Sequence, residues 1–234
     1  MKSPYNLGKR KVSRSKRHGK PAPTSSQFAS KIAAQHRRAH KKLAGFAPGV
    51  AFMGSARTRP GSPYYDKNIE AARAVAALGL NIYHGGGPGN MEASAFGARQ
   101  GGSKSVALCL NLGRSEEVFG PHDVAVWFDD FSPRIDTLRL GGLMAMVFFP
   151  GGIGTMHEAM SVIDNIMQKK APVRPIIFFE PVAERPYWGG LFDWFKGEAM
   201  DIGLLRASDI PFVHIVSTVD ELVAIVKARL TALA

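Results

Sequence analysis

The sequence contains a single cysteine and no long hydrophobic run. Cys109 lies in the apolar run 106–110, where we expect a small core residue in a reducing compartment. No apolar stretch approaches the roughly 20 residues of a transmembrane helix, and residues 1–26 show no apolar segment of a signal peptide. The histidines are scattered and no HExxH motif occurs. These absences favour a cytoplasmic protein with no membrane contact, no metal and no cofactor.

Acidic residues are missing from residues 1–65, which contain 15 Lys and Arg. Residues 66–234 contain the other 15 basic residues and all 19 acidic residues, so the net charge of +11 comes from the N-terminal part. We expect residues 1–45 to form a basic, flexible extension in which residues 27–44 can form a short helix. The apolar residues that could anchor this helix are Phe28, Ile32 and Leu43.

Such an extension has three possible roles that the sequence leaves open. It could bind nucleic acid or another polyanion weakly, although few aromatic residues are present to stack on bases. Its acid-free composition, with Ser and Arg, also overlaps that of an organelle transit peptide. Finally, it could be a solvated tail without a partner.

Beyond the extension, short apolar runs alternate with segments of helical periodicity. Strands are expected at 49–55, 80–84, 105–110, 124–128, 145–149, 175–179 and 212–216, and helices at 64–77, 89–100, 134–143, 155–168, 188–201 and 218–232. Such alternation calls for a parallel sheet with helices on both faces. We predict one α/β domain over residues 46–234, a Rossmann-like three-layer sandwich with a mostly parallel sheet, preceded by the basic tail.

The segment from Pro150 to Thr155 has the character of an anion site. It reads Pro-Gly-Gly-Ile-Gly-Thr, and it lies between an apolar strand and a helix. Glycines allow the backbone to approach a ligand closely, and the free N–H groups of a helix start attract negative charge. No Lys follows the last glycine, so this is not a P-loop. We expect Gly151, Gly152 and Gly154 to bind a phosphate, with Thr155 as the helix N-cap.

Glu158 has two interpretations of about equal weight. Thr155 and Glu158 have the spacing of a capping box, in which the glutamate would accept a hydrogen bond from the N-cap backbone. Alternatively, the carboxylate acts on a ligand beside the phosphate.

Two other glycine turns also follow expected strands, Gly54-Ser55 and 85–90. The second is not the dinucleotide fingerprint, because the last glycine of GxGxxG would fall on Asn90. Ligands of open α/β sheets bind beyond the carboxyl ends of the strands. Three glycine turns at this edge therefore indicate a nucleotide.

These blocks resemble the Lonely guy family of nucleoside 5'-monophosphate phosphoribohydrolases over about residues 49–228. The segments that carry the resemblance are Gly54-Ser55-Ala56-Arg57-Thr58, Gly85-Gly86-Gly87-Pro88-Gly89-Asn90-Met91-Glu92-Ala93, Pro150-Gly151-Gly152-Ile153-Gly154-Thr155-x-x-Glu158, Tyr187-Trp188-Gly189-Gly190-Leu191 and Asp220-Glu221. The resemblance implies hydrolysis of the N-glycosidic bond of AMP or a cytokinin riboside monophosphate, giving the free base and ribose 5-phosphate. It also implies a homodimer or a multiple of dimers.

The family's residue roles transfer to matching positions in this sequence. Glu158 would be the catalytic carboxylate and Arg134 the catalytic arginine. The resemblance assigns nucleotide contacts to Gly54, Ser55, Gly86, Gly87, Gly89, Asn90, Met91, Glu92, Gly151, Gly152, Gly154 and Thr155.

One position departs from the family pattern. The family usually has Lys after the catalytic arginine, where this chain has Ile135. Arg139 lies four residues later, on the same helix face, and either replaces that charge or is an ordinary surface arginine.

Two points of chemistry stay open. The acid that protonates the leaving base could be Glu92, Asp136 or His157, each of which could equally be a solvated or capping residue. A non-hydrolytic nucleotide carrier is an alternative to the hydrolase, because a fold does not fix a function. A pyridoxal phosphate decarboxylase is not expected, since no Lys lies in a glycine block.

Overall fold

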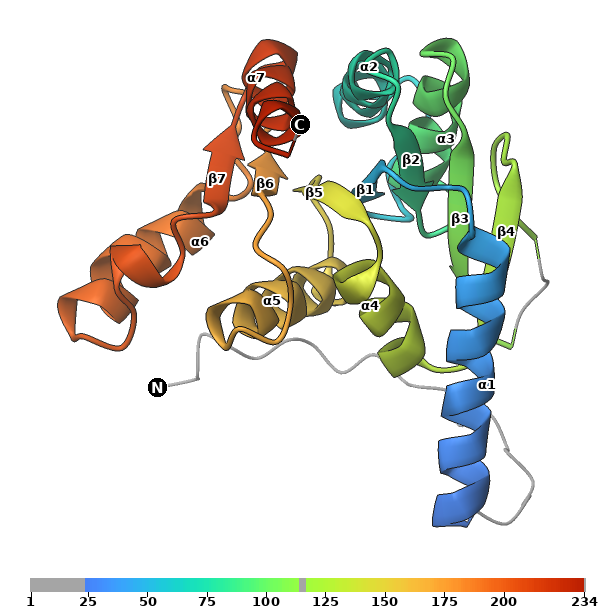
Figure 1. Ribbon diagram of the computed structural model, residues 1–234. Coiled ribbons are helices and arrows are strands. Elements are labelled where there is room, and N and C mark those ends of the chain that lie inside the picture. Colours follow the sequence, from blue (N-terminus) through green and yellow to red (C-terminus); the bar gives the residue numbers. More distant parts are fainter. Residues whose placement is uncertain (1–23, 114–116, 234) are drawn as a thin grey trace, which may run out of the picture.

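The computed structural model describes residues 24–113 and 117–233, and its centre is a parallel sheet of seven strands (Figure 1). The strands are β1 (Gly49–Met53), β2 (Asn81–His84), β3 (Ser105–Leu110), β4 (Val124–Phe128), β5 (Leu143–Phe148), β6 (Ile176–Phe179) and β7 (Val213–Val216). Their order in the sheet is β4-β3-β2-β1-β5-β6-β7, and every neighbouring pair is parallel.

Helices cover both faces of this sheet and make three layers (Figure 1). One face carries α2 (Pro63–Ala76), α3 (Asn90–Gln100) and α7 (Val219–Thr231); the other carries α4 (Phe131–Leu140), α5 (Ile153–Met167) and α6 (Gly189–Trp194). The predicted α/β three-layer fold is therefore confirmed. None of the described helices is long and apolar enough to cross a lipid bilayer.

Phenylalanine runs in the central strands fill both sides of the sheet. On the side of α2 and α7, the ring of Phe149 stacks on that of Phe179 at 4.8 Å between centroids. On the side of α5, Phe178 contacts Trp188 edge to face at 4.9 Å. Because successive side chains of a strand point to opposite faces, these consecutive aromatic residues serve two cores.

Most expected elements lie within three residues of their observed positions. The expected helix 134–143 is shifted to α4, which begins after Asp130 and ends before Gly141. The expected helix 188–201 is divided into α6 and a π-helical segment, Phe195–Ala199.

The strand order reverses beside β1, which pairs with β2 on one side and β5 on the other. At the carboxyl ends of these strands, the Ser55 N–H donates to the Pro150 carbonyl at 3.2 Å, and the Asn90 N–H donates to the Ser55 carbonyl at 3.0 Å. The three glycine turns are thus linked at one edge of the sheet, where α/β proteins bind ligands.

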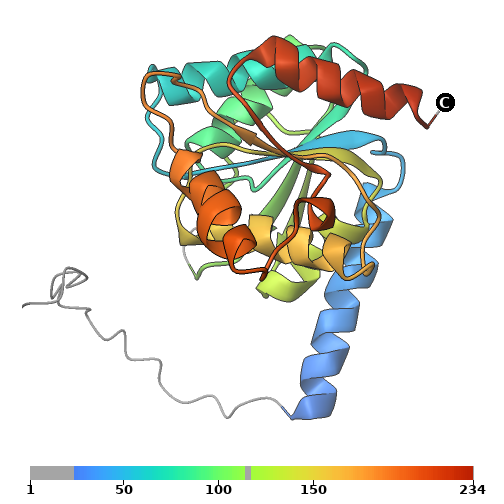
Figure 2. The same cartoon turned by 90° about the vertical axis from the view of Figure 1, so that its left-hand side faces the viewer.

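The basic segment contains a well-defined helix, α1 (Ser25–Leu43), which packs against α4 and β4. The folded unit therefore begins upstream of the boundary predicted at residue 46. The expected anchor Phe28 is about half exposed, and the buried residues of α1 are Gln35 and Ala39. Figure 2 shows that the N-terminal half of α1 extends beyond the three layers. The first half of the predicted extension, residues 1–23, lies outside the described residues.

Polar side chains of α1 cover the outer edge of β4. Lys42 Nζ donates to the Ala125 carbonyl at 3.1 Å, and Arg38 donates to the Trp127 carbonyl. Gln35 Oε1 accepts from the Asp129 N–H at 2.7 Å, and its Nε2 donates to Asp130 Oδ2 at 2.9 Å. These basic and amide groups therefore satisfy strand and helix-start groups that would otherwise be unpaired.

We expect the substitution Gln35→Ala to lower the free energy of unfolding by about 1–3 kcal/mol, because it leaves the part-buried N–H of Asp129 without a partner and the Asp130 carboxylate with Lys31 as its remaining donor. Urea denaturation would measure this change. The matched control is Arg37→Ala on the exposed face of α1, which should change stability by less than about 0.5 kcal/mol. Equal, small effects of both substitutions would show that α1 contributes little to the folded unit.

Candidate functional site

A cavity of about 780 Å³ opens at the edge where the glycine turns meet. This volume is in the range of pockets that hold small-molecule ligands. Its walls come from the turns after β1, β2 and β3, from α4 and from the start of α5. The predicted site residues that line it are Gly54, Ser55, Gly86, Gly87, Met91, Arg134, Gly152, Gly154, Thr155 and Glu158.

The helix start at the cavity differs from the prediction. The N-cap of α5 is Gly152, in extended conformation, and no side chain caps the helix. Thr155 is therefore the third helical residue and not the predicted N-cap, so the capping-box interpretation of Glu158 is wrong. A Cβ atom at Gly152 or Gly154 would meet no atom within 4 Å, so the backbone faces open space there. The first N–H groups of α5 are accordingly free to bind a ligand.

Gly151 shapes this helix start without lining the cavity. A Cβ atom at this position would overlap the side chain of Thr155, so only glycine fits. The Tyr187 hydroxyl donates to the Gly151 carbonyl. Glu180, buried at the end of β6, accepts from the backbone N–H of Tyr187 at 2.7 Å. Tyr187, in the segment that follows β6, therefore holds this turn in place.

Glu158 forms a buried ion pair with Arg134. The two residues are 7% and 5% exposed, and Arg134 Nη1 donates to Glu158 Oε1. Arg134 Nε also donates to the Leu108 carbonyl at 2.7 Å, which ties α4 to the end of β3. The carboxylate that could have capped its own helix instead joins α5 to α4 beside the cavity.

Helix α4 is held at both ends, which fixes the position of Arg134. At its start, Gln35 binds Asp130, the N-cap residue. At its end, the buried Arg174 donates to the carbonyls of Arg139 at 2.9 Å and Gly141 at 3.2 Å. Burial lowers the pKa of Arg174 to about 10, so it remains a cation at neutral pH.

His84 supports the second glycine turn. Its Nδ1 accepts from the Gly86 N–H at 3.1 Å, and its Nε2 is 2.9 Å from Ser105 Oγ. Burial, followed by the neighbouring His122 and Arg134, lowers the pKa of His84 to about 3. The neutral ring therefore holds Gly86, whose φ of +73° suits glycine.

Cys109 lies behind this turn, where a Cβ atom on Gly86 would overlap its Sγ. Cys109 is buried, as expected, and it lines the cavity. Burial raises the pKa of its thiol to about 11, so the thiol is protonated at neutral pH.

Four predicted contact residues do not line the cavity: Gly89, Asn90, Glu92 and Gly151. Asn90 is buried, and its Nδ2 donates weakly to the Pro150 carbonyl at 3.4 Å. Glu92 is close to Tyr65, where burial and then the charge of Glu92 raise the pKa of the phenol to about 12.

Arg139 also lies outside the cavity, so the structure gives no support to it as a replacement for the missing lysine. Its guanidinium pairs with Asp136 at 2.9 Å and donates to Asn165 Oδ1 at 3.0 Å. Ile135 is buried in the core. The proposed proton donors Asp136 and His157 do not line the cavity either: Asp136 pairs with Arg139, and His157 lies edge-on to Phe131.

The cavity also includes residues for which the sequence predicts no contact, although Ala56, Arg57, Pro88 and Ile153 lie within the motif segments. They are Met53, Ala56, Arg57, Pro88, Leu110, Asn111, Leu112, Glu117, Phe119, Trp127, Phe131 and Ile153. Met53, Leu110 and Trp127 lie near the carboxyl ends of strands, and the others lie in the segments that follow strands, so a position at or beyond the carboxyl end of a strand is the signal that the sequence offers. Glu117 adds a second carboxyl group to the cavity, and Phe119, Trp127 and Phe131 give it an aromatic side.

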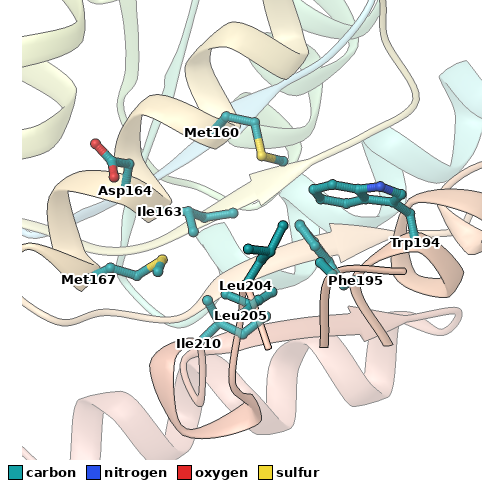
Figure 3. Close-up of a pocket in the computed structure, with 10 residues that line it drawn as sticks. Met160, Ile163, Asp164, Met167, Trp194, Phe195, Leu204, Leu205 and Ile210 are labelled. Atoms are coloured by element: carbon teal, nitrogen blue, oxygen red, sulfur yellow. The ribbon is translucent and has the colours of Figure 1, made fainter. Parts of the chain in front are cut away.

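A second, smaller pocket of about 270 Å³ lies between α5 and the segment after α6 (Figure 3). Apolar side chains such as Met160, Trp194 and Leu204 surround it, and Asp164 stands at its edge. Asp164 is the one ionisable side chain among the described residues that line it. Among the described residues, no three His, Cys, Asp or Glu side chains are arranged to hold a metal ion.

Residues 91–226 match a family described as "Possible lysine decarboxylase", the family of the Lonely guy proteins. The chain belongs to this family. Among curated proteins, no sequence matches it significantly. The Lonely guy resemblance seen in the glycine motifs is thus confirmed at the level of the family.

Solved structures share the fold at low sequence identity. A molybdenum cofactor binding protein from Rippkaea orientalis is 16% identical with a TM-score of 0.58, and the match covers 78% of this chain and 97% of that one. The molybdenum cofactor carrier protein of Chlamydomonas reinhardtii is 19% identical with a TM-score of 0.55, covering 78% and 98%. A structural genomics target, TM1055, is 23% identical with a TM-score of 0.53, covering 77% and 99%. These similarities establish the fold alone.

The pKa of His84 predicts a pH dependence of stability. In the unfolded chain His84 takes up a proton below about pH 6.5, whereas the folded chain resists protonation down to about pH 3. Stability should therefore fall with pH between these values, by about 2 kcal/mol from pH 7 to pH 5 through this residue. The variant His84→Asn should lose this part of the slope in urea denaturation at the two pH values. An unchanged slope would show that another group is responsible.

Proposed function

We propose that the protein hydrolyses the N-glycosidic bond of a nucleoside 5'-monophosphate, such as AMP or a cytokinin riboside monophosphate. The products are the free base and ribose 5-phosphate. The observation that carries this proposal is the buried pair of Arg134 and Glu158 on the wall of a nucleotide-sized cavity, beside an uncapped helix start.

The uncapped start of α5 is suited to the phosphate. Gly152 and Gly154 leave the backbone open to the cavity, and the N–H groups of the first turn carry a partial positive charge. A phosphate held there fixes the attached ribose relative to Glu158, one turn further along α5. Positioning of this kind lowers the barrier by removing the freedom of the reactants beforehand.

Cleavage of a ribosyl C1'–N bond builds positive charge on the sugar, as in glycoside hydrolysis. A carboxylate held in a buried site stabilises such charge, and it can also take the proton of the attacking water. Arg134 holds the Glu158 carboxylate by its Nη1 donor and is itself held by the Leu108 carbonyl. The pair therefore presents a carboxylate with little freedom to move.

The family description names a lysine decarboxylase, a reaction that pyridoxal phosphate enzymes perform with a lysine Schiff base. No lysine is among the described residues that line the cavity. The residues present do not fit that cofactor, and we derive no step through it.

A carrier without hydrolytic activity is the second candidate. Two proteins of the same fold are described as binding or carrying the molybdenum cofactor. Incubation of the protein with a panel of nucleoside monophosphates, followed by chromatography for free base, separates the two functions. Tight binding of a nucleotide without release of base would favour the carrier.

We expect Glu158→Gln to lower the turnover number for base release by on the order of 10²-fold or more, because the negative charge that stabilises the sugar is lost. The glutamine keeps an oxygen that can accept from Arg134. Nucleotide binding, measured by calorimetry, should therefore survive. Near-normal turnover in this variant would refute the catalytic assignment.

The matched control is Asp136→Asn, which removes a carboxylate from α4 outside the cavity. Asp136 pairs with Arg139 and lies near His36, so its loss disturbs the same helix without touching the cavity. Turnover should stay within a few-fold of the wild-type value. An equal loss of turnover in both variants would show that Glu158 acts only through the packing of α4 and α5.

A further inference from the structure

The charges that line the cavity leave a nucleotide phosphate short of a cation. Arg134 and Glu158 neutralise each other, and two of the three guanidinium nitrogens of Arg134 are already bonded. A phosphate monoester carries about −1.5 to −2 charges at neutral pH, whereas a helix start offers roughly +0.5. A further positive group is needed to balance the substrate.

The two positions expected to supply that group do not supply it. Ile135 replaces the lysine of the family pattern and is buried in the core. The guanidinium of Arg139 is occupied by Asp136, Asn165 and the carbonyl of Lys170, away from the cavity.

Arg57 lines the cavity from the turn after β1. It is exposed, and its guanidinium has no hydrogen bond or ion pair within the described part of the chain. Its backbone is fixed, because the Arg57 N–H donates to Ser55 Oγ at 3.0 Å and the Ser55 N–H donates to the Pro150 carbonyl at 3.2 Å. Since β1 and β5 are neighbours, this turn stands beside the turn that opens α5.

We propose that Arg57 is the cation that binds the phosphate monoester of the substrate and makes this site select nucleotides over nucleosides. The assignment rests on the proposed function, in that the ligand is a sugar phosphate. A guanidinium suits this role because two of its N–H groups can donate to two phosphate oxygens at once. Arg57 lines the same cavity as the start of α5, and its guanidinium has no partner among the described residues, so it is available to a phosphate bound there.

Binding measurements test this assignment without any turnover. Calorimetric titration with ribose 5-phosphate should show about tenfold or greater weakening in Arg57→Gln, whereas Arg57→Lys, which keeps the charge, should weaken binding less. The matched control Arg59→Gln changes an exposed arginine of the same loop outside the cavity and should leave the affinity unchanged. Because Arg57 is exposed, both glutamine variants should melt within a few degrees of the wild type.

Kinetics separate this assignment from the proposed function. With AMP, Arg57→Gln should raise KM about tenfold or more, while any release of base from adenosine should be unchanged. Wild-type protein that binds ribose 5-phosphate through Arg57 but releases no base would overturn the hydrolase and leave the Arg57 assignment standing. Cleavage and binding of AMP that are normal in Arg57→Gln would overturn the Arg57 assignment alone. Absence of ribose 5-phosphate binding to the wild type would overturn this assignment whatever the enzyme does.

Discussion

The ion pair between Arg134 and Glu158 is the contact on which the site depends. Two buried charges are stable only when each has a partner and further hydrogen bonds. The positions of α4 and α5 relative to each other are therefore constrained by this pair. Other contacts hold α4 in place: Gln35 binds its N-cap residue, Arg174 donates to a carbonyl at its end, and Arg134 donates to the Leu108 carbonyl. The wall of the cavity that contains Arg134 and Glu158 is therefore held by several contacts, while other walls are glycine turns and exposed loops.

The sequence predicted the layers and the glycine turns because both depend on local rules. The strands are recognisable as apolar runs that end in glycine. The turns are recognisable because a backbone that approaches a ligand closely needs residues without a Cβ atom. The expected start of α5 is wrong because the spacing of Thr155 and Glu158 matches a capping box, whereas the helix begins at Ile153 with Gly152 as its N-cap. The partner of Glu158, Arg134, is 24 residues away in the sequence, and helical or strand periodicity cannot predict a contact over that separation.

The docking of α1 was also beyond prediction, for a different reason. Its contacts are polar as well as apolar: Gln35 is almost fully buried, Leu43 packs against the core as predicted, and Phe28 stays half exposed. The sequence predicts a helix at residues 27–44, but hydrophobic periodicity cannot show that an amide and basic side chains bind it to β4 and to the start of α4. The same limit applies to function, since carriers and hydrolases of this fold would differ only in the few side chains that face the cavity.

The cover that α1 provides over β4 has a consequence for self-association through the sheet. Edge strands can template the addition of another chain, and a sheet that grows without limit needs two open edges. Here Arg38 and Lys42 occupy carbonyls of β4, so within the described residues only β7, a four-residue strand, is open. Addition at a single open edge joins two copies and then stops, which permits a closed pair but not a fibre.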